Sequence, residues 1–189
     1  MCERCNWVNT NPKMIKYHDE EWGVPLHDDG KLFEFIVLEG FQAGLSWQTV
    51  LNKRENFREA FDNFDPEIVA GYDRLKMEEL MNNSSIIRNR LKIAACINNA
   101  RCFLEIQKEF GSFDKYIWKF VDFKPIVNSF NDMKEVPAKT PLSDKISKDL
   151  KKRGFKFVGS TVIYAHMQAT GMVNDHLTYC FRHKEINSM

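Results

Sequence analysis

Apolar residues recur at the spacing of an α-helix along most of the chain, and this periodicity constrains the fold more than any other feature. In two segments they fall three or four positions apart, which places them on one helix face. No segment alternates apolar and polar residues convincingly, as half-buried strands do. The pattern therefore predicts an all-α fold. The periodic positions of the two segments are Leu32, Phe33, Ile36, Val37 and Gly40, then Val50, Leu51, Phe57, Ala60, Phe61 and Phe64.

The remaining helices are predicted from the same periodicity and from residues that favour helix ends. Ser143 and Asp144 favour a helix start, whereas Gly111 and Gly171 favour helix ends. Three prolines within residues 123–141 predict a long connecting loop. A chain of 189 residues suits one domain, so we predict a single helical domain over 1–189. The predicted helices cover residues 32–40, 50–64, 85–111, 113–121, 143–153 and 159–170, and the one over 85–111 is the longest.

Composition and charge limit where in the cell the protein can be, but they do not show whether it binds DNA. The net charge is +1, from 27 basic and 26 acidic residues, so DNA binding is neither favoured nor excluded. No apolar run reaches the roughly 18 residues of a membrane span, and the first residues lack the pattern of a secretory signal. Five cysteines without regular spacing argue against a disulfide framework. We expect a soluble cytoplasmic protein without membrane contact.

Cysteine and histidine residues near both ends of the chain form a candidate metal site. Cys2, Cys5 and His18 lie near the start, and His176 and Cys180 near the end. Zinc takes four such ligands in a tetrahedron, and a His-x3-Cys pair on a helix would place two of them on one face. Two alternatives remain open from the residues alone: these are unrelated core residues, or the two early cysteines form a redox pair. The redox pair is disfavoured, because no thioredoxin-like pattern surrounds it.

An acidic residue among aromatic ones forms a candidate pocket for a nucleobase. Tyr17, Trp22 and Trp47 offer flat faces for stacking, and Glu39 can accept a hydrogen bond from an amine while offsetting positive charge. The alternative is that the rings are plain core and that Glu39 is an exposed residue at a helix end. Apolar neighbours on both sides of Glu39 favour the pocket, because a buried carboxylate without a role is costly.

A glycine-containing junction between two predicted helices forms a candidate phosphate-binding turn. Gly154 and Gly159 lie five residues apart, with Lys156 between them and basic residues at 151–153 before them. Backbone N–H groups of such a turn, and the start of the following helix, can approach a phosphate. The spacing resembles a helix-hairpin-helix over about 143–171, although ordinary helix junctions also have it.

Four segments together resemble the family of bacterial 3-methyladenine DNA glycosylase I, within the helix-hairpin-helix glycosylase superfamily. They are Tyr17–Pro25 (YHDEEWGVP), Leu38–Trp47 with LEG and AGLSW, Lys151–Gly159 (KKRGFKFVG) and Gly171–His176 (GMVNDH). The resemblance runs nearly end to end.

The resemblance implies one structural zinc per chain, a base pocket and a DNA wedge. The zinc would join the two chain ends and leave Cys2 outside the site. A clip that closes nearly the whole chain would contribute directly to stability. The implied residues are Cys5, His18, His176 and Cys180 for zinc, Glu39 with Tyr17, Trp22, Trp47 and Trp7 for the base, and Gly44 with Leu45 for the wedge.

Three positions depart from what the resemblance implies. Met14 stands where the family often has an aromatic residue, so one pocket wall would be a thioether. Asn174, followed by Asp175, stands where the wider superfamily has a catalytic Asp, so we assign no catalytic Asp there. Thr161 stands where bifunctional relatives have a Schiff-base lysine, so we expect no strand cleavage through an imine.

The implied activity is monofunctional hydrolysis of the bond between 3-methyladenine and deoxyribose. Glu39 is the expected catalytic residue, acting as recogniser and electrostatic partner of a base held between Tyr17 and Trp47. The expected partners are alkylated double-stranded DNA and free 3-methyladenine as product, and we expect a monomer. Three alternatives remain: a glycosylase for another lesion, a noncatalytic zinc-stabilised DNA-binding module and, last, a zinc hydrolase, which would need an open metal position.

Overall fold

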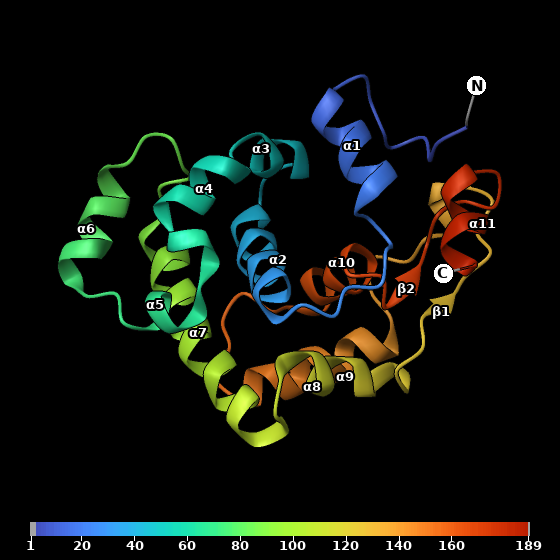
Figure 1. The fold of residues 1–189 in the computed structure, drawn as a ribbon. Helices are drawn as coiled ribbons and strands as arrows, with labels where there is room; N and C mark the ends of the chain where they lie inside the picture. The colour runs from blue at the N-terminus through green and yellow to red at the C-terminus, as the bar shows by residue number, and fades with distance from the viewer. Residues whose placement is uncertain (1–2, 189) are drawn as a thin grey trace.

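The computed structural model describes residues 3–188, and helices make up most of it (Figure 1). No helix among these residues is long and apolar enough to cross a membrane. The helices are α1 (Pro12–Glu20), α2 (Asp29–Gln42), α3 (Trp47–Asn52), α4 (Arg54–Ala60), α5 (Pro66–Ala70), α6 (Arg74–Asn82), α7 (Arg90–Phe110), α8 (Phe113–Trp118), α9 (Pro141–Lys152), α10 (Ser160–Ala169) and α11 (Phe181–Asn187); 3-10 turns occupy Asp62–Phe64, Lys119–Val121 and Met133–Glu135; the strands are β1 (Ile126–Val127) and β2 (Val173–Asn174).

Helix α2 runs through the middle of the molecule (Figure 1) and contains the first of the predicted apolar segments, residues 32–40. It begins at the cap Asp28, whose side chain accepts from the Lys31 N–H, and it is buried on nearly every side from Leu32 to Phe41. Helices α3, α7, α8 and α10 all pack against it. A helix buried all round belongs to the core rather than to the surface.

The predicted helix ends differ from the observed ones where a local cap decides the boundary. The longest helix, α7, starts at Arg90 and not near Ser85, because Asn89 accepts from the N–H groups of the first turn. Its end at Gly111 is confirmed, with φ +84°. Helix α9 starts two residues before Ser143, because a capping box joins Thr140 to Ser143.

Two predictions about regular structure were wrong. The single helix predicted over 50–64 is broken at Lys53 and again after Ala60, where α4 ends. Asp62, Asn63 and Phe64 then have positive φ angles of 49°, 54° and 57°. The absence of strands was also wrong, since Ile126 pairs in parallel with Val173, and Val127 with Asn174. Strands of two residues are too short to show an alternation. The predicted loop over 123–141 holds only one of these strands and one 3-10 turn.

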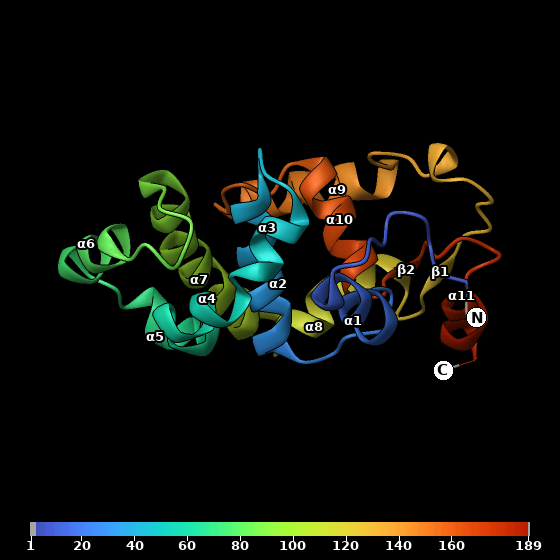
Figure 2. The same cartoon turned by 90° about the horizontal axis from the view of Figure 1, so that it is seen from above.

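The two ends of the described chain lie side by side (Figures 1 and 2). The Phe181 N–H donates to the Glu3 carbonyl, and β2 precedes α11 beside the N-terminal segment. Gly171, which ends α10 with φ +71°, packs so closely on Val24 and Pro25 that an added Cβ would lie 2.4 Å from their backbone atoms. A second, smaller apolar cluster forms in this region, with Cys5, Met14, Tyr17, Trp22, Phe35, Leu51, Ala169, Leu177 and Cys180 as its buried members.

Candidate active site and metal centre

A cavity of about 220 Å³ opens between α1, α2, the start of α3 and α10. This volume lies below the roughly 300–1,000 Å³ of pockets for drug-sized ligands, and it suits a single small ring system. The aromatic residues suggested by the sequence all line it, together with Met14 and Glu39. The full lining is Trp7, Met14, Tyr17, Trp22, Glu39, Gln42, Trp47, Met133, Ala165, Gln168 and Ala169.

Glu39 supplies the charge of this cavity. It lies within α2 and is 3% exposed, so the alternative that it is an exposed residue at a helix end is wrong. Its Oε2 lies 2.9 Å from Nδ1 of His166, while Oε1 has no hydrogen-bond partner among residues 3–188. Burial raises the pKa of Glu39, and the neighbouring His166 opposes part of that rise.

The sequence analysis missed several residues of this region, and His166 is the one among them that contacts Glu39. It lies on α10 and is 1% exposed, between the buried Tyr164 and Met167. A histidine on the apolar face of a predicted helix is a signal that a buried partner exists. Nothing in the local pattern indicates that this partner lies 127 residues earlier in the chain, at Glu39.

The aromatic rings form adjoining walls of the cavity. Trp7 packs edge-on against Trp22, with ring centroids 5.1 Å apart. The rings of Tyr17 and Trp47 lie 5.2 Å apart and are tilted by 47°. A base between two parallel rings would need them about 7 Å apart, twice the contact distance of carbon atoms. The expected sandwich is therefore corrected: the two rings touch, and a ligand can lie only against them.

Two more observations concern polar atoms of these walls. The indole Nε1 of Trp47 is buried without a partner among the described residues. Burial first, and then the charge of Glu39, raises the pKa of the Tyr17 phenol, so that hydroxyl stays protonated. The residues that line the cavity thus carry two hydrogen-bond donors and one carboxylate oxygen without a partner.

The turn between α2 and α3 projects from the molecule (Figure 2). It adjoins the cavity, because Gln42 and Trp47 on either side of it line that cavity. Gly44 has φ +81° with open space around it, and the Leu45 side chain is 42% exposed. The buried ammonium group of Lys92 donates to the carbonyls of Phe41 and Ala43, at 2.7 and 2.6 Å. A cation at these last carbonyls stabilises the helix end and fixes the direction of the turn.

The α9–α10 turn, residues 153–159, lies along the same edge of the molecule as the α2–α3 turn (Figure 2). Gly154 has φ +95°, which favours glycine there. The backbone of Lys156 exchanges two hydrogen bonds with the side chain of Asn99. Asn99 and Lys92 are seven residues apart on α7, so one helix face supports both turns.

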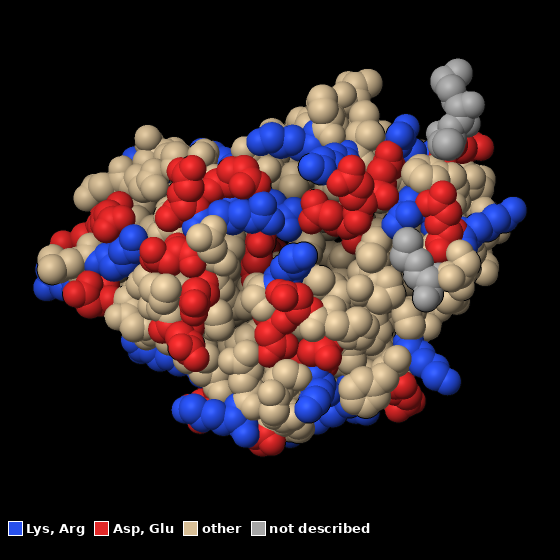
Figure 3. Space-filling model, in the orientation of Figure 1, with Lys and Arg blue, Asp and Glu red and all other residues tan. Residues whose placement is uncertain are grey.

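The face of the molecule opposite the α2–α3 and α9–α10 turns carries both positive and negative side chains (Figure 3). Lys, Arg, Asp and Glu side chains alternate over it, around a cleft of about 670 Å³. Arg54 and Arg58 in this cleft both pair with Glu34, and Arg54 also pairs with Glu21. Paired charges of both signs give no uniform field for a polyanion.

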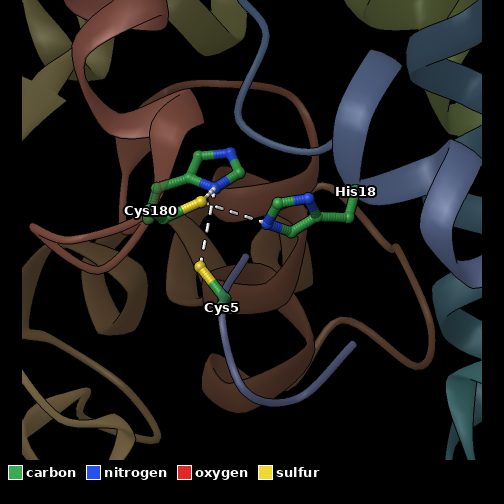
Figure 4. A group of neighbouring side chains, drawn as sticks. Cys5, His18 and Cys180 are labelled. Carbon is green, nitrogen blue, oxygen red and sulfur yellow. Dashed lines mark hydrogen bonds between the residues drawn. The ribbon is translucent and has the colours of Figure 1, made fainter. Parts of the chain in front are cut away.

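Four buried side chains from the two chain ends meet in one cluster (Figure 4). Cys5 comes from the N-terminal segment, His18 from α1 and Cys180 from the turn before α11, and they point toward one another. The donor atoms of these three and of His176 all lie within 4.8 Å of one another. Sulfur to nitrogen distances are 3.4 Å (Cys180 to His18), 3.5 Å (Cys180 to His176) and 3.6 Å (Cys5 to His176).

These distances fit a tetrahedral zinc site. Zinc bonds of about 2.3 Å to sulfur and about 2.0 Å to nitrogen, at tetrahedral angles, separate the two ligand atoms by about 3.5 Å. The outer nitrogen of each histidine has its own acceptor: Nδ1 of His18 donates to Asp19, and Nε2 of His176 to the Trp22 carbonyl. The inner nitrogens are then free of protons and can bind a cation.

The backbone around the cluster differs from the expected helical arrangement. His176 and Cys180 do not share a helix face, because His176 follows β2 and Cys180 is the cap residue before α11. Cys2, left outside the site by the resemblance, lies outside the described residues. A hydrogen bond with Cys5 lowers the pKa of Cys180, which favours the thiolate that metals bind.

The positions compared with the wider superfamily have structural partners. Asn174 bonds to the His183 carbonyl and to Asn187, and the buried Asp175 accepts from Tyr164, Gln168 and Asn128. Asp175 is not among the residues that line the cavity, although its partner Gln168 is.

The chain is similar to known proteins over nearly its whole length. A sequence model of the family described as methyladenine glycosylase matches residues 7–183. DNA-3-methyladenine glycosylase 1 of Escherichia coli (strain K12) is 52% identical over 178 residues, 94% of this chain and 95% of that protein. A crystal structure of 3-methyladenine DNA glycosylase I matches with a TM-score of 0.92 and 52% identity, over 95% of this chain and 98% of the other. A single-residue variant of 3-methyladenine DNA glycosylase I in complex with 3-methyladenine matches with a TM-score of 0.91 and 35% identity, over 94% and 96%.

Proposed function

Because the chain belongs to the methyladenine glycosylase family, we propose that it is a DNA-3-methyladenine glycosylase. It hydrolyses the bond between 3-methyladenine and deoxyribose in alkylated double-stranded DNA and releases the free base, as the first step of base-excision repair. The observation that carries this proposal is the buried Glu39 carboxylate, set among four aromatic residues in a cavity the size of one base.

The positive charge of the lesion explains why a carboxylate and aromatic rings are enough to promote release of the base. Adenine methylated at N3 carries a positive charge in DNA and leaves as a neutral base, so no strong acid is needed for its departure. The protein binds the flipped nucleotide, places the base against Tyr17 and Trp47, and lets Oε1 of Glu39 accept from its amine. Water then attacks a sugar with oxocarbenium character.

Contacts with DNA are assigned to the edge that bears the two turns. Leu45, with Gly44 before it, is the exposed apolar group that fills the space left by the flipped nucleotide. The α9–α10 unit acts as a helix-hairpin-helix, with Gly154, Gly159 and Lys156 near a phosphate. This assignment is supported by α7, whose side chains Lys92 and Asn99 hold the α2–α3 turn and the α9–α10 turn. Because both turns are held by one helix, the distance between them is fixed.

A structural zinc ion is proposed at Cys5, His18, His176 and Cys180. Four buried ligands at tetrahedral spacing, with both outer histidine nitrogens bonded, support it. The ion would tie the two chain ends together and leave no open position for a reactant. His18 follows the cavity residue Tyr17 on α1, so the clip would also hold a cavity wall in place.

Three further parts of the proposal concern reaction type and setting. Thr161 offers no amine, so we expect hydrolysis without strand cleavage. We also propose that the protein acts as a monomer. Buried free cysteines support a reducing compartment such as the cytoplasm.

Two measurements test these proposals separately. Chromatography of bases released from alkylated DNA should give 3-methyladenine, and no released base would reject the glycosylase and leave a noncatalytic DNA-binding module. Metal analysis of the purified protein should give about one zinc per chain. Less than about half an equivalent, with no further loss in His176→Ala, would reject the zinc site.

A further inference from the structure

Glu39 and His166 form a pair that is closed off from solvent and from other charges. They are 3% and 1% exposed, and Nδ1 of His166 lies 2.9 Å from Oε2 of Glu39. Two atoms of the pair have no partner among residues 3–188: Oε1 of Glu39 and Nε2 of His166. Oε1 belongs to a residue that lines the cavity, whereas His166 lies behind that lining.

The free Nε2 determines where the proton of the pair resides. A protonated imidazole would bury a charged N–H at Nε2 without an acceptor, which costs more than a buried lone pair. A protonated Glu39 would donate to Nδ1 and again leave an N–H at Nε2. Neutral His166 with its proton on Nδ1, facing an ionised Glu39, leaves no buried donor of the pair unpaired.

We propose that His166 is a positioning residue for base recognition: it donates from Nδ1 to Oε2, keeps Glu39 ionised, and so turns Oε1 with its full charge toward the cationic base. This inference rests on the proposed function. A protonated imidazole would instead cancel the charge of Glu39 and leave a neutral pair facing a positively charged ligand.

The other groups around Glu39 do not take over this role. Tyr17 of α1 is the other titratable residue of the cavity lining, and its phenol stays protonated. Lys92 of α7 is occupied by carbonyls at the end of α2, and Arg54 of α4 by Glu34 and Glu21. No lysine or arginine occurs among the described residues that line the cavity.

Removal of the imidazole therefore changes how activity depends on pH. The pKa of Glu39 is raised by burial and held down in part by His166. Without His166 the pKa rises further, so the ionised form and the activity that needs it are lost at a higher pH as the solution is acidified. If His166 only filled space, its removal would affect stability but would not move this acidic limb of the pH–activity profile.

The test compares His166→Leu, His166→Asn and the control His27→Leu in single-turnover release of 3-methyladenine across pH. Leu fills the space without a donor, whereas the amide of Asn places a neutral donor near the position of Nδ1. His27 is an exposed histidine that pairs with Asp114 away from the cavity. Thermal unfolding of each variant shows which of them are folded.

We expect the acidic limb of His166→Leu to move up by about one pH unit, which lowers the rate about fivefold at the pH where the wild type is half-maximal. His166→Asn should return to the wild-type limb. Nitrogen NMR of wild-type His166 should show Nδ1–H and a bare Nε2. An unmoved limb in folded His166→Leu, or an Nε2–H tautomer, would overturn the proposal. The NMR measurement decides even if His166→Leu does not fold, and a wild type without base release would instead overturn the proposed function.

Discussion

The substitution Glu39→Gln changes the charge of the cavity while keeping its shape. If His166 donates to the carbonyl oxygen of the new side-chain amide, the NH₂ group of that amide faces the amine of the base, and two donors oppose each other. The fold should be retained, because a neutral amide costs less to bury than a carboxylate. The loss therefore falls on recognition of the cationic base.

The size of this loss follows from the one hydrogen bond that disappears. A charge-assisted hydrogen bond contributes about 1.5–3 kcal/mol. At about 1.4 kcal/mol per tenfold, kcat/KM for release of 3-methyladenine should fall by about 10- to 150-fold. The neutral free base lacks the charge term, so its affinity for the variant should fall less than kcat/KM does.

The assay measures released base by chromatography under single-turnover conditions, beside fluorescence binding of free 3-methyladenine. Glu105→Gln is a matched control, because that carboxylate is exposed on α7 and pairs with the exposed Lys108 away from the cavity. It should leave kcat/KM within about twofold of the wild type. The reasoning would be refuted by a Glu39→Gln protein that releases the base at the wild-type rate.

Three further predictions concern the clip, the fold and the DNA-binding edge. His176→Ala should lose zinc and melt about 10 °C or more below the wild type in calorimetry, and equal metal content and melting temperature would contradict the clip. Gly171→Ala should lower the free energy of unfolding in urea by more than about 2 kcal/mol, because its Cβ would meet the Val24–Pro25 backbone at 2.4 Å. Gly159→Ala, which has open space around it, should lower it by less than about 1 kcal/mol. Similar losses in the two variants would be evidence against this packing. Lys156→Ala should reduce the slope of log affinity for DNA against log salt by about 1, and an unchanged slope would remove Lys156 from the phosphate contacts.

Sequence periodicity predicted the long helices of the core and missed the shorter helices α1, α5, α6 and α11. Helices α2, α7 and α10 have long apolar faces, and the prediction of each is confirmed. Helix α1 has only nine residues, fewer than the roughly 11 over which a helical period is read, although Asn11 and Pro12 at its start are typical of a helix N-terminus. The break after Ala60 involves a left-handed backbone over residues 62–64 that tertiary packing selects, so the periodicity of 50–64 could not show it.

The candidate site was predictable as a set of residue types and not as a geometry. The resemblance brought together the four proposed zinc ligands from both chain ends. The Glu39–His166 pair joins helices 127 residues apart, and Met133 reaches the cavity from a loop without periodicity. The contact between the Tyr17 and Trp47 rings, which excludes a sandwich, depends on side-chain angles that no spacing encodes.

The central claim is that the cavity prefers a heterocycle because of its positive charge. The most direct measurement compares the affinities of 3,9-dimethyladeninium, a cation, and neutral 9-methyladenine for the same protein at the same pH. Because Oε1 of Glu39 is free to accept from the ligand, we predict that the cation binds at least about tenfold more tightly than the neutral base. Glu39→Gln should lose this preference. Equal affinity of the wild type for the two ligands would contradict it.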